Sequence, residues 1–300
     1  MRRVLKWLGI ILFGLVAIVG LVALAGYVAS ERRLNRAYEV AGRALTLPSD
    51  AASVAEGQRL TIIRGCVDCH GADYGGQIMI DSPLIGRAYG PNLTAGQGSA
   101  TADFTVEDWD RAVRHGLGPD GRPLFVMPSY HYAGLSDEDL GRMIAFLRAA
   151  PPVDRAASPS SAGPLTRLML VANQPPPLLS AEVIDHNNPP PASIAAEASP
   201  AFGAYLASSC NGCHGENLAG GPVPFSEPDS PKAANLTPAG ELSSWTLDGF
   251  KNTLRTGVTP GGRELDPLDM PWPLTAQMTD IEIEALWLYL QSLPPATPAG

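Results

Sequence analysis

Two short blocks of the sequence place two cysteines and a histidine in the order Cys-x-x-Cys-His. They consist of Cys66, Cys69 and His70, and of Cys210, Cys213 and His214. This order is the attachment motif of a c-type haem, since two thiols at this spacing can add to the two vinyl groups of the porphyrin. The histidine after the second cysteine can then ligate the iron through a ring nitrogen. The sequence therefore predicts two covalently attached haem c groups.

Paired cysteines could instead form a redox-active pair or a zinc site. A thioredoxin-like pair lies between a strand and a helix of a βαβ pattern, and a zinc site usually has a second ligand pair within about 15–20 residues. Neither block is surrounded by a βαβ pattern, and the two blocks lie in opposite halves of the chain. All four cysteines belong to the blocks, so none is left for a disulfide.

Further matching segments indicate that the blocks belong to a duplicated domain. The matches are 92–94 with 235–237 (Asn-Leu-Thr), 119–122 with 260–263 (Pro-x-Gly-Arg), and 127–128 with 270–271 (Met-Pro). Their offset is nearly constant over a whole domain, which chance would not produce. The predicted organisation is an anchor at 1–30, a stalk at 31–50, a first haem domain at 51–152, a proline-rich linker at 153–197 and a second haem domain at 198–295.

The repeat also helps to assign the second axial position of each iron. In the first domain the candidates are Met79, His115, Met127, His131 and Met143. Only Met127 has a counterpart of the same type, Met270, in the second copy. We therefore predict Met127 and Met270 as distal ligands beside His70 and His214. The alternative for each methionine is a flexible side chain that fills a gap in the core.

Both domains are expected to be mainly α-helical. The predicted helices of the first domain run from Ser53 to Arg64, from Thr105 to His115 and from Ser136 to Ala149, and their first residues are the candidate caps. A glycine- and proline-bearing loop is predicted for residues 71–102, between the first haem block and the next helix. Histidine and methionine together fill the iron and tend to raise its reduction potential, which favours single-electron transfer over chemistry at a vacant site.

The beginning of the chain has the pattern of a membrane anchor. Arg2, Arg3 and Lys6 precede a run without charge at residues 7–30. At about 1.5 Å per residue this run spans a bilayer core of about 30 Å. A cleaved signal peptide ending near Ala25 is the alternative, but its apolar region usually has only about 7–15 residues. Both possibilities place the haem domains on the periplasmic side of a bacterial inner membrane.

Charge limits the kinds of partner. The formal net charge is −9, although three cations stand within the first six residues. An acidic body argues against a nucleic-acid partner and favours a basic docking partner. A merely solvated surface accounts for the charge equally well.

The motifs resemble two class I cytochrome c domains in tandem. That resemblance implies small helical bundles in which the first and last helices cross, with Phe146 and either Trp287 or Tyr289 near the crossings. The Asn-Leu-Thr, Pro-Asp-Gly-Arg and Met-Pro-Ser-Tyr segments are more narrowly similar to cytochrome subunits of periplasmic alcohol, aldehyde and gluconate dehydrogenases. Such subunits take electrons from a flavin or quinone-cofactor partner and pass them onward.

The expected function is therefore that of a membrane-anchored dihaem cytochrome that transfers single electrons. Its donor would be a dehydrogenase or a quinol-oxidising complex, and its acceptor a soluble cytochrome or a terminal oxidase. The alternative is a dihaem enzyme such as a peroxidase, in which one axial ligand is displaceable. No acid–base pair, phosphate-binding loop or nucleophile motif stands out, so no catalysis by this chain alone is expected.

Overall fold

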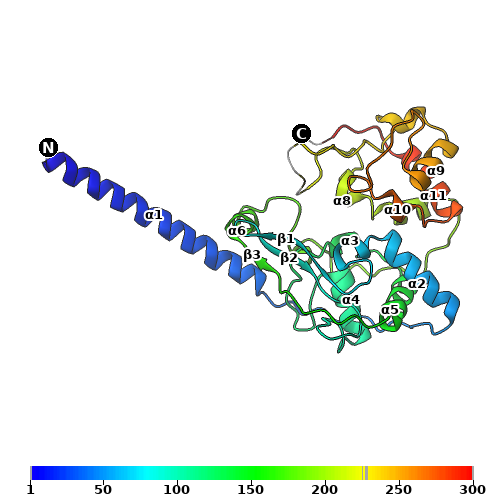
Figure 1. Ribbon diagram of the computed structural model, residues 1–300, viewed down its shortest axis with the longest axis horizontal. Coiled ribbons are helices and arrows are strands. Elements are labelled where there is room, and N and C mark those ends of the chain that lie inside the picture. The colour runs from blue at the N-terminus through cyan, green and yellow to red at the C-terminus, as the bar shows by residue number, and fades with distance from the viewer. Residues whose placement is uncertain (1, 225, 227–228, 299–300) are drawn as a thin grey trace.

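A long helix projects from a body made of two helical units (Figure 1). The computed structural model describes residues 2–224, 226 and 229–298. Helix α1 (Arg2–Leu34) carries the apolar run, and its large apolar side chains are exposed. Among the described residues it is the one helix long and apolar enough to cross a membrane, a criterion that signal sequences also meet. It continues four residues beyond the predicted end of the anchor at residue 30.

The two units contain corresponding helices. The first unit consists of α2 (Ala51–Ile63), α3 (Cys66–His70), α4 (Val106–His115), η1 (Ser129–His131) and α5 (Asp137–Ala149). The second consists of α7 (Pro200–Ala207), α8 (Asn211–His214), η3 (Glu241–Ser244), α9 (Leu247–Thr256), α10 (Trp272–Thr275) and α11 (Asp280–Ser292). The prediction of a mainly α-helical fold with a duplicated helical domain is confirmed.

Two of the three predicted N-cap residues are found at the start of their helices. Thr105 caps α4 and forms a capping box with Asp108, and the hydroxyl of Ser136 accepts a hydrogen bond from the backbone of α5. The prediction that Ser53 caps the first helix is wrong. Asp50 takes this position, because its carboxylate accepts a hydrogen bond from the Ser53 amide at 2.9 Å and starts the helix earlier.

Residues 71–102 are not the continuous loop that was predicted. They contain a hairpin of β1 (Gln77–Ser82) and β2 (Gly86–Gly90), and β2 also pairs with β3 (Ser161–Ala162). The three strands form one antiparallel sheet in the order β1-β2-β3. The segment between the two units supplies β3, α6 (Pro164–Val171) and η2 (Ser180–Glu182), all of which lie near the first unit or the end of α1.

A glycine allows the first and last helices of each unit to cross closely. A Cβ atom added at Gly57 of α2 would lie 2.0 Å from the carbonyl oxygen of Arg142 on α5, and Phe146 is beside it. In the second unit, a Cβ at Gly203 of α7 would lie 2.0 Å from the carbonyl oxygen of Ala285 and 2.6 Å from the Cβ of Tyr289. Phe146 and Tyr289 therefore lie at the crossings, as the family resemblance implied.

Substitution of either crossing glycine should destabilise the fold. Alanine normally stabilises a helix relative to glycine by about 1 kcal/mol. At Gly57 or Gly203 the added methyl group would force the helices apart, at a cost typical of overpacking, about 1–3 kcal/mol or more. We expect Gly57→Ala and Gly203→Ala to lower the midpoint of denaturant unfolding. Gly134→Ala is the control, because a Cβ there meets no atom within 4 Å; equal midpoints for all three variants would contradict the close crossing.

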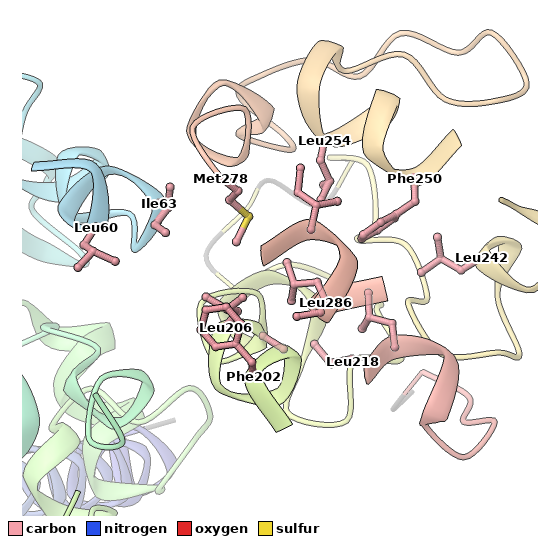
Figure 2. Close-up of a cluster of buried hydrophobic side chains, with 14 of the residues drawn as sticks. Leu60, Ile63, Phe202, Leu206, Leu218, Leu242, Phe250, Leu254, Met278 and Leu286 are labelled. Atoms are coloured by element: carbon pink, nitrogen blue, oxygen red, sulfur yellow. The ribbon is translucent and has the colours of Figure 1, made fainter. Parts of the chain in front are cut away.

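The two units share part of one hydrophobic core. Leu60 and Ile63 of α2 belong to the same buried cluster as Phe202, Leu206 and many side chains of the second unit (Figure 2). Because this cluster draws side chains from both units, its burial stabilises their contact. The units are therefore packed against each other and do not depend on the linker alone for their arrangement.

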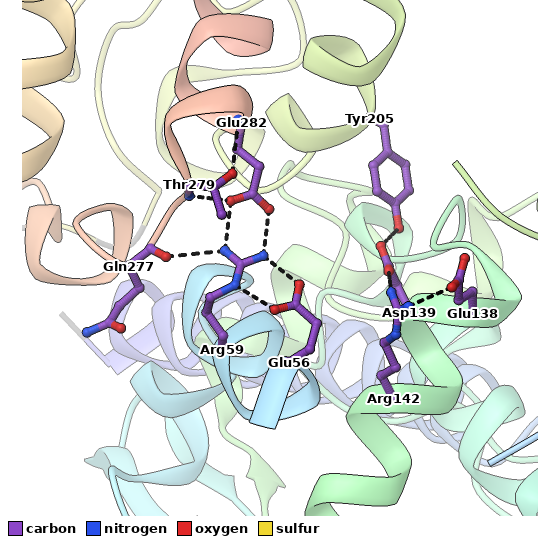
Figure 3. A network of polar contacts seen from close by, with 9 residues as sticks. All are labelled: Glu56, Arg59, Glu138, Asp139, Arg142, Tyr205, Gln277, Thr279 and Glu282. Carbon is purple, nitrogen blue, oxygen red and sulfur yellow. Dashed lines mark hydrogen bonds and ion pairs between the residues drawn. The ribbon is translucent and has the colours of Figure 1, made fainter. Parts of the chain in front are cut away.

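A charged network lies at the edge of the junction (Figure 3). The Arg59 guanidinium donates to both carboxylate oxygens of Glu282 on α11, at 2.7 and 2.8 Å, and also to Glu56 on its own helix. On the other side of the junction, the Tyr205 hydroxyl donates to the Asp139 carboxylate at 2.6 Å. The bonds to Glu282 and Asp139 join side chains of different units, 223 and 66 positions apart in the sequence, and fix the orientation of one unit against the other.

Candidate haem sites

Each Cys-x-x-Cys-His block forms a short helix directly after the first helix of its unit. Between α2 and α3 the chain turns at Gly65, whose φ of 75° is in the left-handed region that favours glycine. The turn places Cys66, Cys69 and His70 on one short helix. In the second unit, α8 carries Cys213 and His214, and Cys210 is its N-cap residue. The local fold thus brings together the three predicted residues of each block.

The two proximal histidines have the same hydrogen bond. The Nδ1 atom of His70 lies 2.8 Å from the carbonyl oxygen of Pro91, and Nδ1 of His214 lies 2.8 Å from that of Ala234. Because a carbonyl can only accept, Nδ1 carries the proton in both rings. The remaining nitrogen, Nε2, then has a free lone pair, which is the arrangement in which histidine ligates a metal.

The surroundings of the histidines favour the neutral ring. Burial lowers the pKa of His70, and the Pro91 carbonyl opposes this effect to a smaller degree. The pKa of His214 is lowered for the same reason, with Ala234 in the role of Pro91. A neutral imidazole is the ligating form. Both sites are therefore prepared for coordination near neutral pH.

The four cysteines have the environment of structural thiols. They are not paired in disulfides. Burial raises the pKa of the Cys66 thiol to about 12 and that of Cys210 to about 11. Redox-active cysteines have lowered pKa values and accessible thiols. A thioredoxin-like role, the first alternative for these blocks, is therefore disfavoured.

The Asn-Leu-Thr segments hold the loops that orient the histidines. Asn92 follows Pro91, and its side-chain amide donates to the carbonyl oxygen of Val153 at 2.7 Å, while the Thr94 hydroxyl accepts from the Val153 amide. In the second unit, Asn235 and Thr237 make the same two bonds to Ala296. Each segment thus clamps the chain that leaves the last helix, which explains why this polar triplet recurs in both copies.

Met127 and Met270 occupy equivalent places before a short helix. Both side chains are half-buried, and each is followed by a proline and then by η1 or α10. The Met127 carbonyl oxygen accepts hydrogen bonds from the Ser129 amide at 2.9 Å and from the Ser180 hydroxyl at 2.5 Å. The Met270 carbonyl oxygen accepts from the Trp272 amide at 2.6 Å. Their role as iron ligands stays a prediction.

The other candidates have different surroundings. Met143 is buried in the core, and Met79 lies on β1 with an exposed side chain. His115 pairs with His186, with 3.0 Å between their Nδ1 atoms. The ring of His131 is packed against Tyr130, with 4.0 Å between the ring centroids. None of these four residues has an equivalent of the same type in the second unit.

The chemistry of the residues fits a haem better than a bare metal ion. Within residues 2–224, 226 and 229–298, no group of three histidine, cysteine or acidic side chains is arranged to hold a metal ion. Trp109 is buried in a cluster that Cys66 and Val67 also contact, and its Nε1 has no hydrogen-bond partner among the described residues. An unpaired buried donor costs about 1–3 kcal/mol. The propionate groups of a haem would supply acceptors for such a donor.

Arg64 connects the two blocks, and the sequence alone did not identify it. It stands two positions before Cys66 and is 2 % exposed. Its Nη1 donates to the carbonyl oxygen of Tyr205 at 3.1 Å and to the hydroxyls of Ser208 and Ser209, the residues just before Cys210. The guanidinium also lies over the Tyr205 ring, 4.5 Å from its centroid. No carboxylate of the described residues forms a salt bridge with it. A lone arginine beside a motif gives no spacing signal that could have identified it.

Two family models match this chain, one for each unit. Residues 52–147 match the model of cytochrome c oxidase, cbb3-type, subunit III, and residues 200–294 match the model of cytochrome c. Cytochrome c domains imply the binding of haem c, and two haems fit two domains. The comparison thus agrees with the duplicated Cys-x-x-Cys-His sites.

Similar proteins cover most of the chain. It is 27% identical over 285 residues to the cytochrome c subunit of alcohol dehydrogenase (quinone) from Gluconacetobacter polyoxogenes, covering 87% of this chain and 60% of that protein. It is also 27% identical to the fructose dehydrogenase cytochrome subunit of Gluconobacter japonicus, with 83% of this chain and 54% of that one covered. A diheme cytochrome c-type protein of Cereibacter sphaeroides is 27% identical over 80% of this chain and 86% of its own.

The length of these proteins differs from that of this chain. The chain spans 60% or less of the first two relatives, but most of the diheme protein. The relatives and the two family models agree on the type of domain. The chain therefore consists of two cytochrome c domains in tandem behind an N-terminal apolar helix, and it is related to cytochrome c subunits of dehydrogenases and to a diheme cytochrome c.

Proposed function

We propose that this protein is a membrane-anchored dihaem cytochrome c that relays single electrons on the periplasmic side. The observation that carries the proposal is the pair of matched histidine sites in two units that share one core. Cys66, Cys69, Cys210 and Cys213 would attach the haems covalently. His70 and Met127 would ligate one iron, and His214 and Met270 the other. A haem supplies a one-electron couple whose potential the axial ligands and the surrounding charges set.

The residues of the chain support this role through position and electrostatics. The carbonyl groups of Pro91 and Ala234 hold the histidine rings, and the Asn-Leu-Thr segments hold those carbonyl groups. The shared core fixes the distance between the units. Helix α1 would keep the relay at the membrane surface, with the basic N-terminus on the cytoplasmic side.

The relatives suggest the class of redox partner. The cytochrome subunits of alcohol, fructose and gluconate dehydrogenases are named as parts of dehydrogenases. By this analogy, the donor of the present chain is a dehydrogenase or a quinol-oxidising subunit, and the acceptor is a cytochrome or a terminal oxidase. The acidic body, with a net charge of −9, suits a docking partner with a basic surface.

Counting haems in variants tests the proposal. The full chain, produced in cells that attach haem c and purified in detergent, should contain two haems. Cys66→Ala with Cys69→Ala should leave one haem, and Cys210→Ala with Cys213→Ala should leave the other. The pyridine haemochrome spectrum measures the number and the covalent attachment. Two haems that persist in either double variant, or haem that organic solvent extracts from the wild type, would contradict the assignment.

The same preparation separates electron transfer from peroxidase chemistry. With both irons filled by histidine and methionine, the oxidised protein should show methionine–iron charge-transfer absorption for two haems and should bind no carbon monoxide when reduced. Rapid carbon monoxide binding to one haem, together with peroxide turnover, would instead favour the enzyme. Proteins that co-purify from solubilised membranes would identify the donor and acceptor.

A further inference from the structure

Exposed apolar side chains gather in one place outside α1. Among the described residues beyond α1, eleven large apolar side chains are exposed, and seven of them belong to the β1–β2 hairpin or to α6. They are Ile78, Met79, Leu84, Ile85, Leu165, Leu168 and Val171, and we refer to them together as the apolar foot. Leu168 is 62% exposed and Leu84 is 58% exposed. A concentration of exposed apolar side chains on the surface of a folded domain usually marks an interaction site.

Hydrogen bonds join the two elements that carry the foot. The Leu165 amide donates to the carbonyl oxygen of Leu84 at 3.0 Å, and the Gly163 amide donates to that of Ile85 at 2.8 Å. The hydroxyl of Thr166 also donates to the Ile85 carbonyl oxygen, at 2.5 Å. The tip of the hairpin is therefore bonded to the first turn of α6, and the two elements cannot separate without breaking several hydrogen bonds.

Helix α6 is attached to α1 at the end of the apolar run. The Arg167 guanidinium lies over the Tyr27 ring, 4.3 Å from its centroid, and donates to the Ser30 hydroxyl at 2.8 Å and to the Glu31 carboxylate at 2.6 Å. Arg33 donates to the carbonyl oxygen of Leu170 and to the carboxylate of Glu182. Figure 1 shows α6 and the strands beside the C-terminal end of α1.

This attachment fixes the position of the foot along the axis of α1, and therefore its depth relative to the bilayer. If α1 spans the bilayer with its uncharged residues 7–30, then Tyr27 and Ser30 lie where the acyl chains meet the headgroups. Tyrosine is enriched at that boundary, and long cationic side chains extend toward it. The foot is fixed at the same level by Arg167 and Arg33. An apolar face at this depth can enter the outer layer of the membrane by about 5–10 Å, as interfacial amphipathic helices do.

We propose that the apolar foot is a second membrane contact that inserts into the periplasmic surface of the lipid bilayer. The inference rests on the proposed anchoring by α1. The inserted foot would hold the first cytochrome domain against the membrane, because the hairpin also contacts the first haem block. The Gln77 side chain donates to the carbonyl oxygen of Asp68 at 2.6 Å, and a Cβ at Gly90 would lie 1.8 Å from the carbonyl oxygen of Cys69. The foot thus connects the lipid surface to Cys69 through one hairpin.

Cross-linking to lipid tails tests the contact on the full chain. The haem-loaded protein would be placed in bilayers of phosphatidylcholine and phosphatidylglycerol that contain a lipid with a photoactivatable diazirine in its acyl chain. Mass spectrometry of the digested protein would locate the acyl adducts. We expect adducts on α1, on residues 78–85 and on residues 165–171. Ile281 and Leu288 of α11 are the internal control, because they are exposed and apolar but lie on the second domain.

The outcomes separate the foot from the anchor. Adducts on α1 without adducts on the foot would overturn the proposal and leave the anchor intact, whereas no adducts on either would overturn both. Similar adducts on Ile281 and the foot would mean nonspecific reaction and would also overturn it. In the variant Leu84→Ser with Leu168→Ser, we expect the foot adducts to be lost while those on α1 remain. Both side chains are exposed, so these substitutions leave the core unchanged, and haem content provides the check.

Discussion

Replacing Met127 with alanine should lower the reduction potential of one haem and leave the other near its wild-type value. Replacing Met270 with alanine should do the reverse. A thioether ligand favours the reduced iron, so its loss stabilises the oxidised form. The decrease should be a sizeable part of the roughly 0.8 V over which axial ligands set haem potentials. Spectroelectrochemical titration of the purified full chain, fitted with two one-electron couples, measures both values.

Two further methionines provide matched controls. Met79→Ala changes an exposed side chain, and Met278→Leu changes one that is buried in the shared core. Both variants should retain the two wild-type potentials and the methionine–iron absorption. A potential that falls in Met79→Ala but not in Met127→Ala would show that the distal ligand of the first domain had been assigned to the wrong residue.

Replacing Arg64 with methionine should lower the potentials of both haems together. Arg64 is a buried cation that contacts the residues beside Cys66 and Cys210 and has no carboxylate partner among the described residues. A nearby positive charge favours the reduced iron, which has one positive charge less. A unit charge at about 10 Å in an effective dielectric of about 20 changes a one-electron step by about 1.7 kcal/mol, or roughly 70 mV.

The Arg64 variants are chosen to separate charge from packing. Methionine keeps much of the length of arginine, and two of the buried arginine nitrogens, Nε and Nη2, have no hydrogen-bond partner to lose among the described residues. An apolar replacement of a buried charge is often tolerated. Arg64→Lys should keep both potentials near the wild type, because it retains the positive charge. It loses the stacking on Tyr205, so it separates the effect of charge from that of packing. If Arg64→Met binds two haems and neither potential moves, the electrostatic role is refuted.

Arg59→Gln is the control for the domain junction. It removes bonds to Glu56 and Glu282 and so weakens the contact between the units without removing the cation that lies beside both blocks. Its main effect should be on stability. A joint decrease of both potentials in Arg59→Gln as large as that in Arg64→Met would attribute the effect to domain packing.

The parts of the fold that the sequence predicted are local or repeated. Thr105 and Ser136 cap helices because a hydroxyl at that position bonds a backbone amide three residues later. The recurrence of Asn-Leu-Thr and Met-Pro indicates the duplicated domain, because each copy needs the same side chains at the same places. The assignment of His70, Met127, His214 and Met270 to the irons remains a prediction that the potentials will test.

The parts that were missed depend on contacts between distant segments. The short strand β1 is stabilised by β2, and β2 is paired in turn with β3, which belongs to the segment that follows the first domain in the sequence. Periodicity indicates that Leu60 and Ile63 are inward-facing, but it does not indicate that the second domain covers them. The partners of Arg64 are about 140 positions away, at Tyr205 and Ser208, and no local pattern encodes such a contact.

The shared core has a consequence for the kinetics of the relay. Tethered carriers that meet by diffusion transfer electrons only when a domain reaches a productive orientation, and such domain motions take microseconds to milliseconds. Here Leu60 and Ile63 are buried against the second domain, and the guanidinium of Arg59 is bonded to Glu282. In the proposed relay, the electron would therefore cross a gap between two domains that are packed together. Domain motion would then not limit the internal step, and it would matter only for the encounters with donor and acceptor.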